Sequence, residues 1–104
     1  MLLFKRKFQE AIRSGRKTRT VRLWRGRHVR PGDVHFAPGV GYLRVLAVEE
    51  VTLDELTEED ARADGFTSLT ALKAELDRLY AQAARGSRRW YRIAFEYLGG
   101  SRPA

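Results

Sequence analysis

The sequence predicts a single α+β domain, built as a small mixed or antiparallel β-barrel with flanking helices. Three observations lead to this fold class. The 104 residues are enough for one domain but not for two. Apolar residues make up 43% of the chain, which is enough to form a globular core. The expected elements follow the order helix, several strands, two helices and strand, without the regular strand–helix alternation of a doubly wound sheet.

The first third of the chain is expected to form a helix, a strand and a basic loop. Apolar side chains in residues 4–12 recur at the spacing of one helical face, and Gly15 stands where the helix should end. Residues 18–24 alternate between apolar and polar or basic side chains, which predicts a strand with one inward face. The basic loop at residues 25–30 ends in a turn at Pro31-Gly32-Asp33.

The middle of the chain is expected to contain two strands. Val34 and Phe36 indicate a short strand, and residues 38–41 have the composition of a turn. Residues 42–53 are predicted to form a long strand with a bend near Glu49-Glu50.

Two helices and a strand should complete the domain. Residues 57–60 resemble a capping box, so a short helix should begin there and stop at Gly65. Ser68 can cap a second helix, whose apolar stripe ends at Tyr80. Residues 81–87 are expected to be a loop and residues 90–98 a strand. The domain is therefore assigned to residues 1–98, and residues 99–104 to a flexible tail.

Composition excludes several classes of protein. The chain has no cysteine, so neither disulfides nor thiolate metal sites are available. His28 and His35 are its only histidines, and we expect no metal site and no cofactor. No apolar run approaches the roughly 18 residues that span a bilayer. The expectation is a cytoplasmic protein without a membrane segment.

The net charge of +7 is unevenly distributed along the sequence. Residues 1–30 hold eleven of the twenty basic residues and only one acidic residue, whereas residues 31–104 hold nine basic and twelve acidic residues. Such asymmetry is typical of an electropositive face that binds phosphates. The alternative is a solubilising surface rich in arginine.

One segment has the composition most suited to catalysis or phosphate binding: Gly15-Arg16-Lys17-Thr18-Arg19-Thr20-Val21-Arg22. Thr18, Thr20 and Arg22 should share one face of the strand, and Lys17 directly precedes the strand. A cation beside a hydroxyl can activate the oxygen as a nucleophile or bind a phosphate. The alternative is an exposed edge strand protected from aggregation by its charges.

Asp64 is the second candidate. It lies in the last turn of its helix, where the macrodipole disfavours an anion by about 0.3–1 kcal/mol. A cationic partner such as Lys17 or Arg22 would account for it. Alternatively, Asp64 is one more acid in a helix that is acidic throughout.

Aromatic residues near basic ones could stack on nucleobases. Trp24, Trp90 and Tyr91 have this context, although aromatic residues in strands more often belong to a core.

These residues resemble those of the ASCH family, whose members have a PUA-like barrel. The resemblance extends from Phe4 to Leu98. It depends on the glycine-lysine-threonine segment described above and on six further motifs: Phe8 with Ile12, Pro31-Gly32-Asp33, Val51-Thr52-Leu53, Leu56-Thr57-Glu58, Asp64-Gly65-Phe66, and Trp90-Tyr91 with Phe95. The PUA-like relation implies RNA binding, although a shared fold does not determine a function.

The family includes a small bacterial enzyme that removes the acetyl group from N4-acetylcytidine. The resemblance implies that Thr20 would attack the amide carbonyl and Lys17 would take or share its proton. Asp64 would hold the lysine or relay protons, in a position where the enzyme has glutamate.

The first hypothesis is a module that binds single-stranded RNA or a modified nucleoside. Its candidate nucleic-acid contacts are Arg16, Lys17, Arg19, Arg22, Trp24, Arg25, Arg27 and Tyr91. The alternative is an amidohydrolase acting on N4-acetylcytidine with Lys17, Thr20 and Asp64 as its catalytic residues. A nuclease of single-stranded RNA and a protein-interaction module remain open as further alternatives.

Overall fold

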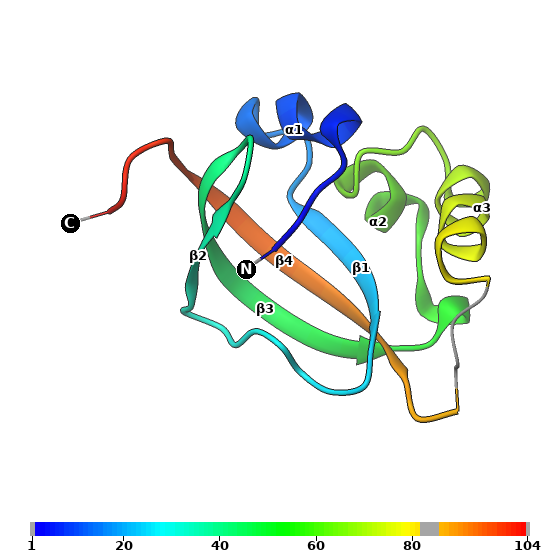
Figure 1. Cartoon of the computed structure of the whole chain (residues 1–104). Coiled ribbons are helices and arrows are strands. Elements are labelled where there is room, and N and C mark those ends of the chain that lie inside the picture. Colours follow the sequence, from blue (N-terminus) through cyan, green and yellow to red (C-terminus); the bar gives the residue numbers. More distant parts are fainter. Residues whose placement is uncertain (1, 82–85, 104) are drawn as a thin grey trace.

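The computed structural model of the chain describes residues 2–81 and 86–103 (Figure 1). The residues fold into helices, one 3-10 turn and strands, in the order α1 (Arg6–Arg13), β1 (Arg19–Trp24), β2 (Val34–Ala37), β3 (Gly41–Val51), η1 (Leu53–Glu55), α2 (Glu58–Ala63), α3 (Leu69–Tyr80) and β4 (Arg89–Gly99). This order confirms the α+β class. Most of the loop expected at residues 81–87 lies outside the described residues.

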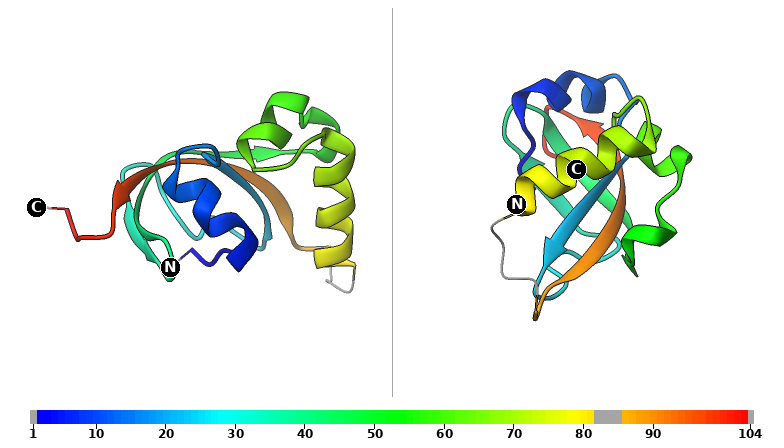
Figure 2. Two further views of the ribbon diagram at one scale, coloured as in Figure 1. Left: turned by 90° about the horizontal axis from the view of Figure 1, so that it is seen from above. Right: turned by 90° about the vertical axis from the view of Figure 1, so that its right-hand side faces the viewer.

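The strands form one antiparallel sheet in the order β1-β4-β3-β2. β4, the last strand in the sequence, therefore lies in the interior of the sheet, and β1 and β2 form its edges. The sheet curves around the N-terminal segment and α1, while α2 and α3 lie beyond β1 (Figures 1 and 2). Among the described residues no ladder joins β1 to β2, so the closed barrel stays a prediction.

The long strand β3 departs from the expected form at two points. Its register shifts between Val45 and Ala47, which leaves Leu46 unpaired with about half of its surface exposed. A bulge of this kind bends a strand, whereas the expected bend at Glu49-Glu50 lies in regular pairing with β4. The strand also ends at Val51 instead of residue 53, because Thr52 forms a capping box with Glu55 and starts η1.

Two hydrophobic clusters hold the elements together. The first joins Leu2 and Ile12, from the N-terminal segment and α1, to the sheet, with Phe95 among its largest buried side chains. The second lies beneath α2 and α3 and includes Val21 of β1. Phe4 packs against Phe95 but precedes α1, so the helix begins later than the apolar spacing predicted. β1 thus lies where the two clusters meet.

Candidate active site

Two helices end in the same way on either side of β1. After α1, Gly15 adopts a φ of 83° and its N–H bonds to the carbonyl of Ile12, while the Arg16 N–H bonds to the carbonyl of Ala11. These are the two bonds of a Schellman motif, which requires a left-handed residue that glycine provides without strain. Both expected helix stops at glycine are confirmed, because α2 ends in the same motif.

At the end of α2, Gly65 has a φ of 95° and its N–H bonds to the carbonyl of Arg62 at 3.0 Å. The N–H of Phe66 bonds to the carbonyl of Ala61 at 2.8 Å. A further bond of 2.7 Å, from the Thr18 N–H to the carbonyl of Ala63, ties this helix end to the start of β1. The two glycine stops therefore bring together Lys17, two residues after Gly15, and Asp64, directly before Gly65.

Lys17 and Asp64 form a buried ion pair. The Lys17 ammonium donates to Oδ1 of Asp64, to the Asp64 backbone carbonyl at 2.5 Å and to the Arg19 carbonyl at 3.1 Å. The Lys17 and Asp64 side chains are only 2% and 6% exposed. Rings of Phe4 and Phe8 cover the ammonium, with centroids 5.8 and 4.8 Å away. The cationic partner expected for Asp64 is thus present.

Burial shifts both pKa values toward the neutral forms. Desolvation lowers the pKa of Lys17 from its usual value, although the carboxylate of Asp64 opposes the shift. Desolvation likewise raises the pKa of Asp64, against the effects of Lys17, Arg22 and a hydrogen bond from the Val21 backbone. A proton can therefore move between the two groups, or leave Lys17, at a smaller cost than in water.

Thr20 lies on the same strand face as Arg22, as the alternation of side chains predicted. The Nε of Arg22 donates to Oγ1 of Thr20 at 3.0 Å, and its terminal nitrogen donates to the carbonyl of Leu3 at 2.7 Å. Thr20 is 4% exposed. A fixed cationic donor thus lies beside a nearly buried hydroxyl.

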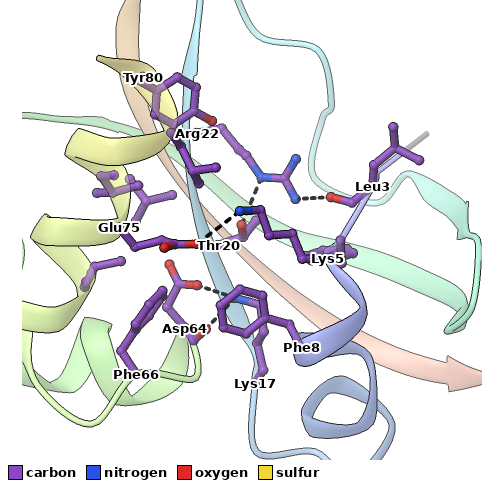
Figure 3. Close-up of a pocket in the computed structure, with 15 residues that line it drawn as sticks. Leu3, Lys5, Phe8, Lys17, Thr20, Arg22, Asp64, Phe66, Glu75 and Tyr80 are labelled. Atoms are coloured by element: carbon purple, nitrogen blue, oxygen red, sulfur yellow. Dashed lines mark hydrogen bonds and ion pairs between the residues drawn. The ribbon is translucent and has the colours of Figure 1, made fainter. Parts of the chain in front are cut away.

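These groups line one pocket of about 240 Å³ at the outer edge of β1 (Figure 3). Its polar wall contains Lys17, Thr20, Arg22 and Asp64. Its apolar wall comes from the N-terminal segment, α1, the end of α2 and α3. The residues of this wall are Leu3, Phe4, Phe8, Phe66, Leu72, Leu76, Leu79 and Tyr80. The pocket can enclose a small aromatic molecule and present polar groups to one side of it.

The pocket contains two charged residues that the sequence did not single out, Lys5 and Glu75. They form an ion pair of 3.4 Å between the N-terminal segment and α3 (Figure 3). Glu75 is an acid within the otherwise apolar stripe of α3, which is the one sequence signal that could have identified it.

The other predicted nucleic-acid contacts do not line this pocket. Arg16 pairs with Glu10 on the surface, and Arg19 pairs with Asp60 at 2.8 Å. Arg25 is exposed beyond the end of β1.

The aromatic candidates and their basic neighbours pack together elsewhere. Tyr91 is buried in the first cluster, and the ring centroids of Trp24 and Tyr91 are 6.0 Å apart. The guanidinium of Arg27 lies over the ring of Tyr91. The binding roles of these residues stay predictions.

The described residues contain neither a metal-ligand cluster nor a membrane-spanning helix. No group of three or more His, Asp or Glu side chains there is arranged to hold a metal ion. Within the same ranges, no helix combines the length and the apolar character that a membrane span requires.

Comparison with known proteins gives close relatives. The chain is 38% identical over 103 residues to an N(4)-acetylcytidine amidohydrolase of Klebsiella pneumoniae strain 342, covering 93% of this chain and 95% of the relative. A protein of the same name from Escherichia coli K12 is 36% identical over 104 residues, with the same coverage. In solved structures, the ASCH domain from Lactobacillus crispatus JV V101 matches with a TM-score of 0.72 and 13% identity, over 85% of this chain and 68% of that one.

The chain belongs to the ASCH-domain family. A second structure, protein EF3133 from Enterococcus faecalis V583, has the same fold with a TM-score of 0.68 and 18% identity, covering 94% of this chain and 74% of that one. No family model matches the sequence. As a member of the ASCH family, the chain aligns with its amidohydrolase relatives over most of the length of both proteins.

Proposed function

We propose that this protein is an amidohydrolase that removes the acetyl group from N4-acetylcytidine. The observation that carries the proposal is the buried Lys17–Asp64 pair in the same pocket as the nearly buried hydroxyl of Thr20. The amidohydrolase names of relatives with 36–38% identity support the same reaction.

In the first step, Oγ1 of Thr20 attacks the acetyl carbonyl carbon of the substrate. Lys17 must first lose the proton with which it pairs with Asp64, a loss that its lowered pKa favours; its uncharged amine then takes the hydroxyl proton of Thr20. The amide C–N bond then breaks, the departing cytidine amino group receives a proton from Lys17, and an acetyl ester remains on Thr20.

In the second step, water attacks the acetyl ester. Lys17 takes one proton from the water and passes it to the oxygen of Thr20 as the ester bond breaks; the product leaves as acetic acid, which loses its proton to solvent. Each step returns the residues to their initial protonation state.

Arg22 and Asp64 support these steps in different ways. Arg22 donates to Oγ1 of Thr20 and so stabilises negative charge that develops on that oxygen. Asp64 orients the Lys17 amine and can share its proton, because both pKa values are shifted toward neutral forms. Aspartate replaces the glutamate of the family's enzyme at this position, and here it reaches the lysine.

The pocket size favours a nucleoside over a polymer as the substrate. About 240 Å³ lies just below the range of roughly 300–1,000 Å³ that is typical of pockets for drug-sized ligands. RNA binding through the basic N-terminal third stays a separate prediction, and of its candidate arginines Arg22 lies in the pocket.

Chromatography of N4-acetylcytidine after incubation with the protein tests the proposal. We expect cytidine to appear, and we expect a loss of at least about a hundredfold in Thr20→Val, which keeps the side-chain shape but removes the nucleophile. Glu96→Gln is the matched control, because Glu96 pairs with Arg44 outside the pocket. No cytidine from the folded wild-type protein, or full activity in Thr20→Val, would overturn the assignment.

A further inference from the structure

Glu75 has an unusual position for an acidic residue. It lies on the same side of α3 as Leu72, Leu76 and Leu79, which line the apolar wall of the pocket. Its side chain is only 11% exposed. An acid on a buried helical stripe costs solvation free energy, so its place on this face needs a compensating interaction.

Three cations provide that interaction. Lys5 and Lys7 each lie 3.4 Å from Oε2 of Glu75, and Arg78 donates to Oε1 at 2.9 and 3.2 Å. These contacts hold the pKa of Glu75 below its usual value, chiefly through Arg78, so the side chain is an anion at neutral pH. All three cations are 43–61% exposed, and Lys5 also lines the pocket, so Glu75 lies between the pocket and solvent-exposed charges.

Oε2 is available to a ligand. Contacts of 3.4 Å are at the long end of hydrogen bonding, and both lysines can turn toward water at little cost because exposed ion pairs are weak. A ligand hydroxyl can therefore replace either lysine as a donor. None of the steps through Thr20, Lys17 and Asp64 requires Glu75, so its role is in binding.

The proposed reaction determines which part of the substrate meets Glu75. The acetyl group must reach Thr20, which is nearly buried, so the sugar of the nucleoside remains toward the exposed lysines at the mouth. A ribose carries two adjacent hydroxyl donors there, and a carboxylate is an acceptor-only group that can bind both.

We propose that Glu75 accepts hydrogen bonds from the ribose 2′- and 3′-hydroxyls and makes the pocket selective for ribonucleosides. This inference rests on the proposed function for the orientation of the substrate. A 3′-phosphate in an RNA chain would remove one donor and place a second anion beside the carboxylate, so the same residue favours a free nucleoside over an internal RNA nucleotide.

Equilibrium binding of the reaction product tests this role without requiring turnover. Titrations of cytidine and 2′-deoxycytidine, followed by NMR chemical shifts, are compared in wild type, Glu75→Gln and the control Glu96→Gln. We expect wild type and the control to bind cytidine about tenfold more tightly than 2′-deoxycytidine, since a hydrogen bond to a charged acceptor is strong. In Glu75→Gln the ratio should fall to about twofold or less, mainly through weaker binding of cytidine.

A parallel assay separates this inference from the proposed function. Hydrolysis of N4-acetylcytidine is measured in wild type and in Glu96→Gln, in which it should be equal because Glu96 lies outside the pocket. Thermal unfolding shows separately that Glu75→Gln is folded. Equal binding of the two nucleosides by wild type, or a ratio retained in Glu75→Gln, overturns the role of Glu75 even if hydrolysis occurs. Selective binding without hydrolysis by wild type supports Glu75 and instead overturns the amidohydrolase assignment.

Discussion

At the scale of single residues, the buried Lys17–Asp64 pair is the least ordinary feature of the protein. Two charges removed from water stabilise a fold only if each has its partner, and loss of one leaves the other uncompensated. Asp64→Asn should therefore lower the free energy of unfolding by about 3–5 kcal/mol at neutral pH. The backbone carbonyls that Lys17 also contacts favour the lower end of this range.

The loss in Asp64→Asn should shrink as pH rises. Without the carboxylate, the folded-state pKa of Lys17 falls further below 10.5, while the unfolded chain keeps the ordinary value. The unfolded state then binds more protons than the native state between these two values, so stability increases with pH across that window. Urea unfolding at a series of pH values measures this slope; a stability loss that is independent of pH would contradict it.

Replacement of both charges is the matched control for this prediction. Lys17→Met with Asp64→Leu removes the pair and leaves apolar side chains of similar size, a change that is often neutral or stabilising. We expect the double variant to unfold near the wild-type urea midpoint and to lack hydrolytic activity. A double variant as unstable as Asp64→Asn would mean that the pair is needed for folding, not for chemistry.

At the scale of elements, the site depends on where two helices stop. Gly65 holds a φ of 95° between the end of α2 and Phe66, and an added Cβ would meet Phe8 at 3.4 Å and Lys17 at 3.6 Å. These are ordinary contact distances, so the main cost of Gly65→Ala is backbone strain, about 1–2 kcal/mol. Thermal unfolding should show this loss.

Gly26→Ala is the control for Gly65→Ala. Gly26 lies in the basic loop with open space around a new Cβ and no left-handed φ, so its substitution should change stability by less than about 0.5 kcal/mol. Equal effects of the two substitutions would show that the helix stop at Gly65 has no special conformational requirement.

Local signals in the sequence were sufficient to predict most of the elements and the core of the site. The glycine stops, the capping box at Thr57 and the shared strand face of Thr20 and Arg22 are each determined by neighbours in the chain, and the structure contains them. A cationic partner for Asp64, either Lys17 or Arg22, was one of two interpretations of an acid at a helix end, and in the structure that partner is Lys17.

Features that depend on distant contacts were not predictable in the same way. Glu75 faces the pocket only because the N-terminal segment brings Lys5 and Lys7 across to α3, about seventy positions away in sequence. The bulge at Leu46 depends on the register of β3 against β4, which no local pattern encodes. Periodicity also could not show that Phe4 packs on β4 from outside the helix.

At the scale of the whole molecule, the basic excess is partly neutralised by specific partners. Arg16 pairs with Glu10, Arg19 with Asp60, and Arg92 bridges Asp60 and Glu49. The long-range field of the chain is still positive, with a net charge of +7. That field attracts a polyanion but does little for an uncharged nucleoside.

Salt dependence therefore separates the two kinds of ligand. We expect kcat/KM for N4-acetylcytidine to change by less than about twofold between about 50 and 200 mM salt, because the substrate carries no phosphate. Single-stranded RNA, if bound through the basic third, should lose affinity steeply over the same range. A steep salt dependence of nucleoside hydrolysis would contradict the binding of an uncharged substrate in this pocket.

The central claim is that a buried lysine paired with aspartate acts as the base beside Thr20. The most direct test is the pH dependence of kcat/KM for cytidine release from N4-acetylcytidine. The rate should rise with pH as Lys17 loses its proton and level off at an apparent pKa clearly below 10.5, because burial lowers the pKa of this lysine. A rate that follows the ordinary lysine pKa, or no cytidine at any pH, would contradict the claim.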